Sequence, residues 1–223
     1  MGEWLGVAVK HTLQDARLSL LNLPSESMQP LFIPPDYFRE LRAEEIFADA
    51  SRPLEIDLGC GDGTFILGMA QRYPERNFLG VERNRGRVAI TANKIKNLNL
   101  TNARVMRLES AYTVSWLLPT AGVSRLHLLC PDPWPKKKHA ERRMVNREEF
   151  LTGLERILGP GGEFMLKTDD RVYFDDAAVS FATRQAFTLL EWPEDLCFYP
   201  TTDFEKQWLG QGRAIYRERW QRR

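Results

Sequence analysis

Hydrophobic residues follow two alternating patterns from about residue 54 onward. Short apolar runs alternate with longer segments in which apolar residues recur every three or four positions. The runs predict buried strands, and the longer segments predict amphipathic helices. The expected strands are 54–58, 77–81, 103–108, 125–129, 163–167, 187–192 and 214–220, and the expected helices are 63–72, 85–96, 112–118, 147–158 and 170–184.

Strands that alternate with helices indicate βαβ units and a parallel sheet. The last two strands are joined without a helix, so we expect them to pair antiparallel at the edge. The predicted fold is α/β, a doubly wound Rossmann-like sheet over residues 51–223, mostly parallel with one antiparallel edge strand. Residues 1–50 are interrupted by prolines and are expected to form a partly irregular N-terminal extension with a short helix at 36–50.

Composition narrows the possible partners and compartments. Lys and Arg total 31 against 30 for Asp and Glu, so a polyanion would have to be held by local patches. Cys60, Cys130 and Cys197 lack metal-ligand spacing, which fits a reducing compartment and argues against disulfides and a metal site. No apolar stretch approaches the ~20 residues of a membrane helix. We therefore expect a soluble, cytoplasmic protein, with His11 and His127 in structural roles.

A proline-rich corner ends the fourth expected strand. Pro131-Asp132-Pro133-Trp134-Pro135 follows the buried run directly. Prolines fix φ and remove backbone donors, so Asp132 and Trp134 are held on a stiff, non-helical segment. Rigidity of this kind is frequent at functional sites, although a plain proline-rich connector is the alternative.

Cations follow the corner directly. We expect them to contact phosphates, which gives affinity without sequence information. A solvated charged face remains the alternative. The residues are Lys136, Lys137, Lys138, His139, Arg142 and Arg143.

A glycine-rich turn, Gly59-Cys60-Gly61-Asp62-Gly63, follows the first strand. Glu82 ends the second strand about 20 positions later, where an acidic residue binds ribose hydroxyls. Asp57 and Asp62 would repel the pyrophosphate of a dinucleotide but suit a cationic, phosphate-free ligand. We therefore expect S-adenosylmethionine rather than NAD, with an ordinary tight turn as the alternative.

The motifs together resemble those of the tRNA (guanine-N7-)-methyltransferases, in the family's order and over about residues 50–220. They are Gly59–Gly63, Gly80-Val81-Glu82, Pro131–Lys136, Arg142-Arg143, Lys167-Thr168-Asp169 and Thr202–Glu205. The resemblance implies a class I methyltransferase domain that transfers a methyl group from S-adenosylmethionine to N7 of a guanine in the variable loop of tRNA.

The resemblance also implies roles for individual residues. Asp57, Glu82 and Asp132 would contact the cofactor, as would the turn glycines Gly59 and Gly61. Where the family has an Asp after the third strand, this chain has Glu109-Ser110, so either residue is a candidate for the adenine contact. The implied substrate contacts are Lys136, Asp169, Thr202, Asp203, Phe204 and Glu205.

The chemistry of the reaction suggests what Asp132 does. Guanine N7 is an unprotonated acceptor, so no general base is required. Positive charge passes to the imidazole ring of the base, and a fixed carboxylate stabilises it. Asp132 ends the fourth strand, where open α/β sheets bind ligands, so we expect it to be catalytic through electrostatics and positioning. A turn-capping carboxylate is the alternative.

Other site residues also have alternative interpretations. Trp134 either stacks on a base or belongs to the core. Asp169 is either a substrate contact or the N-cap of the next helix. Glu205 is expected to accept from guanine N1–H and N2–H₂, but Thr202 and Glu205 also form a capping-box pattern.

Three other function classes explain fewer of these features. An NAD-dependent reductase has no use for the cations, and a non-catalytic RNA-binding module has no need of Asp57 and Glu82. Methylation of a small molecule or a protein also leaves the cations unexplained. The sequence leaves open whether the chain is a monomer or a homodimer.

Overall fold

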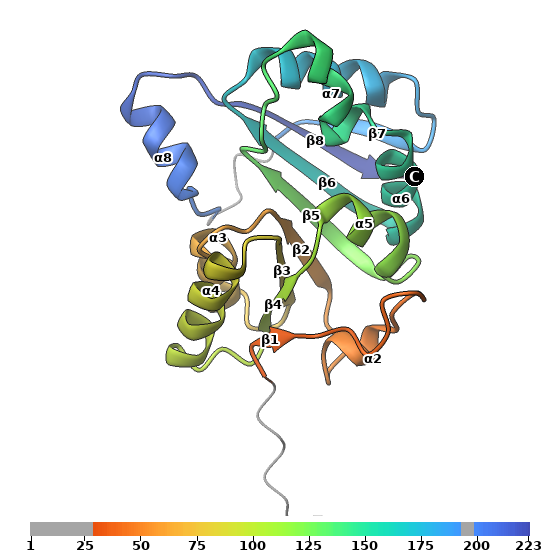
Figure 1. Cartoon of the computed structure of the whole chain (residues 1–223). Helices are drawn as coiled ribbons and strands as arrows, with labels where there is room; N and C mark the ends of the chain where they lie inside the picture. The colour runs from red at the N-terminus through yellow and green to blue at the C-terminus, as the bar shows by residue number, and fades with distance from the viewer. Residues whose placement is uncertain (1–28, 193–198) are drawn as a thin grey trace, which may run out of the picture.

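A single sheet with helices on both faces forms the core of the computed structural model, which describes residues 29–192 and 199–223 (Figure 1). The eight strands of this sheet lie in the order β1-β4-β3-β2-β5-β6-β8-β7. Their bounds are β1 Leu31–Phe32, β2 Leu54–Leu58, β3 Asn77–Glu82, β4 Ala103–Arg107, β5 Val123–Leu129, β6 Leu158–Thr168, β7 Phe187–Leu190 and β8 Tyr216–Arg222.

Helices α3 and α4 cover one face of the sheet, and α5, α6 and α7 cover the other (Figure 1). The helices are α2 Ala43–Ile46, α3 Thr64–Arg72, α4 Arg85–Asn97, α5 Ser110–Tyr112, α6 Glu148–Ile157, α7 Arg171–Ala182 and α8 Asp203–Gly210. A π-helical turn, Thr113–Leu117, follows α5, and two 3₁₀ turns, Lys137–Arg142 and Met144–Asn146, precede α6. In the described ranges no helix is long and apolar enough to cross a membrane.

The predicted α/β fold and its mostly parallel sheet are confirmed, and the last two strands, β7 and β8, pair antiparallel at one edge of the sheet as expected. β8 is antiparallel to both β6 and β7 and lies between them, so the edge strand is β7. Trp220 of β8 explains this position, because its ring stacks on Phe164 (5.6 Å) and Phe181 (4.2 Å) inside the core. An apolar side chain of this size is stabilised by burial on a strand with neighbours on both sides.

Two helix predictions were too long. Of the helix expected at 36–50, only α2 forms, and the 112–118 helix is the short α5 followed by the π-helical turn. Tertiary contacts decide both, since the Leu41 amide donates to the Leu117 carbonyl at 2.8 Å. β1 pairs with β4, and Leu41 and Ile46 are buried, so the described part of residues 1–50 joins the core.

The helix α8 lies in the segment that we expected to be a loop. Thr202 is its N-cap, with the hydroxyl accepting from the Glu205 amide at 3.1 Å. A Ser, Thr, Asp or Asn cap of this kind supplies a partner for one of the free amides of the first turn. The helix stands over the carboxyl ends of the strands (Figure 1).

His127 has the structural role expected of it. Its ring bridges the Glu55 carboxylate and the Tyr199 hydroxyl, at 2.8 Å from each. Burial opposes ionisation of Glu55, yet the hydrogen bond to His127 and the charges of nearby arginines lower its pKa to about 2. His11 and Cys197 lie outside the described residues.

Candidate active site

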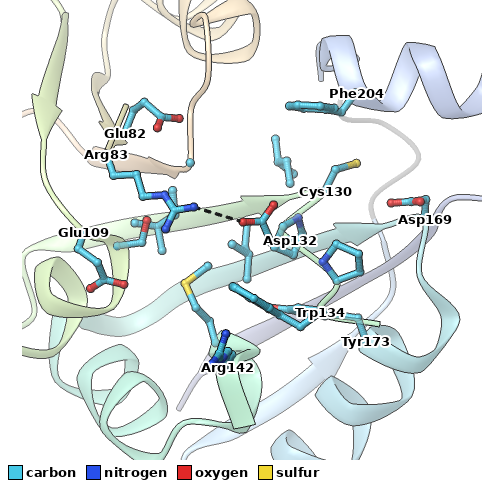
Figure 2. Close-up of a pocket in the computed structure, with 18 of the residues that line it drawn as sticks. Glu82, Arg83, Glu109, Cys130, Asp132, Trp134, Arg142, Asp169, Tyr173 and Phe204 are labelled. Carbon is cyan, nitrogen blue, oxygen red and sulfur yellow. Dashed lines mark ion pairs between the residues drawn. The ribbon is translucent and has the colours of Figure 1, made fainter. Parts of the chain in front are cut away.

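A cavity of about 820 Å³ opens at the carboxyl ends of the central strands. Glu82 and Glu109 lie on one side of it and Phe204 on the other, with Asp132 and Trp134 on the corner between them (Figure 2). Ligand sites in proteins typically measure about 300–1,000 Å³. The cavity therefore has room for a ligand with a polar end and an aromatic-lined end.

The glycine turn forms one wall of this region. Gly59 (φ 74°), Gly61 (φ 56°) and Gly63 (φ 83°) have left-handed backbones, which glycine adopts at little cost. A Cβ on Gly63 would also meet Thr91 Cγ2 at 2.7 Å. The Gly61 amide donates to Glu82 Oε2 at 3.2 Å, so the turn and the acidic end of β3 are held together.

Asp57 lies beneath the turn as a buried carboxylate. It is 4% exposed, and its Oδ2 atom has no hydrogen-bond partner among the described residues. Burial and then the nearby Glu82 charge raise its pKa to about 7. A second cavity of about 130 Å³, lined by Asp57, Thr64 and Thr202 among others, adjoins the first. A buried carboxylate without a partner is costly unless a cation pairs with it, so this chamber suits a positively charged group.

The proline corner has an unusual backbone that protein contacts hold in place. Cys130 (φ 49°) and Trp134 (φ 45°) are left-handed non-glycine residues, each costing about 1–3 kcal/mol. The Cys130 amide donates to the Lys167 carbonyl at 2.8 Å, and the Arg143 guanidinium donates to the carbonyls of Pro133 (2.8 Å) and Trp134 (3.2 Å). These contacts make the corner a rigid support for Asp132.

Asp132 projects from that corner into the cavity (Figure 2). Its side chain is 73% exposed, and Arg83 Nη2 lies 3.7 Å from Oδ2. Trp134 lines the cavity as a half-buried side chain rather than a core residue. Asp132 and Trp134 therefore both line the cavity at the carboxyl end of β5, where the position of the corner after a strand predicts them.

The cations after the corner divide into two groups. Lys136, Lys138 and Arg142 are exposed, and the Arg142 guanidinium lies 5.0 Å from the centre of the Trp134 ring. His139 is half-buried and edge-on to the same ring at 5.9 Å. Nothing is described for the Lys137 side chain.

Arg143 does not belong to the exposed strip, which corrects the expectation of a phosphate contact there. It is 3% exposed and forms an ion pair with Asp176 at 2.6 Å. Its guanidinium is hydrogen-bonded to the Asp176 carboxylate and to two carbonyls of the corner. It therefore stabilises the corner and is not available to a phosphate.

The two acidic residues after β6 have different partners. Asp170 caps α7 by accepting from the Tyr173 amide at 2.7 Å, so capping does not account for Asp169. Asp169 instead accepts from Arg213 at 2.8 Å, at the rim of the cavity. The structure thus assigns the capping interaction to Asp170.

The segment at the start of α8 is only partly on the cavity wall. Phe204 lines the cavity, and Asp203 accepts from the Thr64 hydroxyl at 2.6 Å. Glu205 is buried, with Oε1 bonded to Lys167 Nζ at 2.8 Å and Oε2 without a described partner. Glu205 lines neither cavity, so the structure does not place it at the surface that a base would touch.

Glu109 and Ser110 both line the acidic end of the cavity. Glu109 also caps α5, since its Oε2 accepts from the Tyr112 amide at 2.6 Å. Both remain candidates for a cofactor contact.

Several cavity residues were not predicted from the sequence, among them Arg83, Tyr173, Trp208 and Arg213. Arg83 follows Glu82 directly, which is the one local signal available for it. Trp208 lies four positions after Phe204 and shares its helix face, but that spacing is informative only if α8 is expected.

Comparison with known proteins links the chain to methyltransferases. A family model described as "Putative methyltransferase" matches residues 51–218. The tRNA (guanine-N(7)-)-methyltransferase of Syntrophotalea carbinolica is 35% identical over 74% of this chain and 72% of its own length. That of Oceanobacillus iheyensis is 35% identical over 75% of this chain and 79% of its own.

Solved structures share the fold at low identity. The 16S rRNA methyltransferase KamB is 17% identical with a TM-score of 0.59, covering 82% of this chain and 95% of that one. TrmN from Thermus thermophilus is 16% identical with a TM-score of 0.55, covering 81% of this chain and 47% of that one. These similarities support the fold alone.

Proposed function

This chain belongs to the tRNA (guanine-N(7)-)-methyltransferase family, and from this we propose that its cavity holds S-adenosylmethionine beside a guanine of the tRNA variable loop. The methyl group then passes to N7 of that guanine. The observation that carries the proposal is one cavity with an acidic side, aromatic walls and the Asp132 corner, adjoined by the chamber that Asp57 lines.

The residues of the acidic end and of the adjoining chamber fit this cofactor. Asp57 offers a buried acceptor without a partner, which suits the amino group of the methionine part. Glu82 would accept from the ribose hydroxyls, and Glu109 or Ser110 would contact the adenine. The glycines of the turn leave the backbone open to close approach. When bound, the cofactor supplies an electrophilic methyl group.

The remaining residues position the base and respond to charge. N7 has no proton to remove, so the chain has to orient the base rather than act on it with a general base. Trp134 and Phe204 give the cavity aromatic walls on which a base can stack. Asp132 provides a negative charge on a rigid support, which stabilises positive charge as it develops on the guanine ring.

The direct test is incubation of the protein with tritiated S-adenosylmethionine and unmodified tRNA, followed by nucleoside analysis. We expect the label in 7-methylguanosine. A matched tRNA with adenosine at the target position should take up none. Label in another nucleoside, or none in either tRNA, would refute the proposed reaction.

We expect cofactor affinity to weaken as the pH falls, because of Asp57. Burial and the nearby Glu82 charge raise the pKa of this carboxyl to about 7. Below that pH the group is protonated, and a cationic ligand has to displace the proton in order to bind. The dissociation constant should therefore rise about tenfold between pH 8 and pH 6 in calorimetry.

The control for this measurement is Asp57→Asn, which retains any titration of the ligand itself. It should bind more weakly at both pH values and lose the part of the pH dependence that belongs to Asp57. Identical pH profiles for the two proteins would remove Asp57 from the cofactor site.

Replacing the exposed cations Lys136, Lys138 and Arg142 with Ala should weaken tRNA binding. The slope of log affinity against log salt concentration should flatten by roughly 0.7–0.9 for each phosphate that the protein no longer neutralises. Affinity for S-adenosylmethionine should stay near its original value. A control variant removes three exposed cations that line neither cavity, Arg42, Lys96 and Arg171. Equal slopes for the two variants would indicate that the strip is only a solvated face.

A further inference from the structure

Two stacked pairs of tryptophan and arginine line the main cavity. On the corner, the Arg142 guanidinium lies 5.0 Å from the centre of the Trp134 ring. At the other pair, the Arg213 guanidinium lies 4.2 Å from the centre of the Trp208 ring. All four residues border the cavity, one pair from the corner and the other from α8 and the turn that follows it. Figure 2 shows the corner and α8 on opposite sides of the opening.

Arg213 is held in one orientation by three contacts. Nη1 donates to Asp169 Oδ2 at 2.8 Å, the backbone amide donates to the Trp208 carbonyl at 3.0 Å, and the ring of Trp208 supports the guanidinium plane. The Asp169 side chain is only 9% exposed, so the carboxylate that holds Arg213 is itself fixed in position. An arginine fixed in this way loses little further freedom when it binds a ligand.

The guanidinium still has unused donors. Asp169 takes one nitrogen, the side chain remains 50% exposed, and no second acceptor bonds to it among the described residues. A planar guanidinium with a free edge matches the oxygens of a phosphate. Its location at the cavity rim is where an anion attached to an inserted base would lie.

Extrusion of a base from RNA has a geometric consequence. The base enters the pocket while its two flanking phosphates stay with the backbone at the pocket mouth. Arg142, stacked on Trp134, can contact a phosphate only on the corner side of the cavity. On the α8 side Arg213 combines a free edge with a fixed orientation, and Arg87, whose guanidinium lies 5.4 Å from the centre of the Phe204 ring, is a second cavity cation.

We propose that Arg213, stacked on Trp208 and fixed by Asp169, binds a backbone phosphate next to the target guanosine, across the cavity from Arg142. The inference rests on the proposed function and adds a subsite to it. Asp169 is then a positioning residue that acts through Arg213. The competing interpretation is that the Arg213–Asp169 pair only fastens the turn after α8 to the end of β6.

Arg213→Gln and Asp169→Asn in the full-length protein distinguish the two interpretations, because both break the ion pair but only the first removes the cation. We expect Arg213→Gln to weaken tRNA binding about tenfold or more and to flatten the salt slope by roughly 0.7–0.9. Asp169→Asn should retain the slope, and Arg213→Lys should restore part of it. Affinity for S-adenosylmethionine should not change.

The control is Lys206→Gln, which removes a cation from α8, the helix that precedes the turn with Arg213. Lys206 lines neither cavity, and its nearest carboxylate lies 3.9 Å away. It should leave the slope close to that of the original protein. Equal flattening by Lys206→Gln and Arg213→Gln would overturn the assignment of a specific phosphate contact.

Modified RNA locates the contact. A tRNA with one neutral methylphosphonate, placed either 5′ or 3′ of the target guanosine, should bind the original protein more weakly at one of the two positions. Arg213→Gln should be insensitive at that same position. If the original protein methylates tRNA but Arg213→Gln keeps the slope and both methylphosphonate effects, the pair is only a structural fastening. A protein that fails to methylate tRNA at all would instead refute the proposed function, and this inference with it.

Discussion

Asp132→Asn is expected to slow single-turnover methyl transfer by about 10²–10³-fold, with S-adenosylmethionine and tRNA both saturating. The substitution keeps the shape of the side chain and removes its charge. Asp132 stands on a corner held by Cys130 and by the Arg143 contacts, so the backbone should not move. The slower rate would then report the missing electrostatic stabilisation of the guanine ring.

The matched control is Asp175→Asn, a carboxylate on α7 that is 52% exposed and lines neither cavity. It should methylate at the original rate. If Asp132 only binds the cofactor, Asp132→Asn would raise the dissociation constant for S-adenosylmethionine and leave the saturated rate near normal. That second result would exclude the catalytic assignment.

Arg143→Met is expected to destabilise the fold by roughly 3 kcal/mol. Removing one partner of a buried ion pair costs about 3–5 kcal/mol, because the other charge is left without its counterion. Asp176 keeps 29% exposure, which places the effect at the lower end. The carbonyls of Pro133 and Trp134 would also be left without their donor. Urea unfolding followed by circular dichroism measures the change.

The neighbouring Arg142→Met is the natural control, since Arg142 is exposed and has no ion pair among the described residues. It should change stability by at most about 0.5 kcal/mol while it weakens tRNA binding. The Arg143 variant should therefore lose stability, whereas the Arg142 variant should lose affinity for tRNA. Equal stability of the two variants would contradict the bracing role of Arg143.

Local sequence determined the parts of this protein that depend on short segments. The run Leu54–Leu58 and the glycines after it specify a buried strand and a left-handed turn, since apolar burial and freedom at positive φ are properties of a few adjacent residues. The prolines around Asp132 likewise fix a corner by their own covalent geometry. Because parallel strands end at one edge of the sheet, Glu82 and Asp132 could be placed on one cavity from these segments alone.

Tertiary structure decided whatever depends on residues far apart in the chain. β8 lies between β6 and β7 because Trp220 packs against Phe164 and Phe181, which no local pattern specifies. Arg142 and Arg143 are adjacent and chemically identical, yet only Arg143 is buried. The reason is its ion pair with Asp176, more than thirty residues later in the chain.

The same holds for the far side of the cavity. Asp169 meets Arg213 across 44 positions of sequence, and Lys167 meets Glu205 across 38, so neither partner could be predicted from the segment around the other. Periodicity and turn chemistry act within a few residues, whereas charges and rings pair wherever the fold brings them together. The strand ends that line the cavity were therefore encoded locally, and the contacts that orient them were set only by the packed fold.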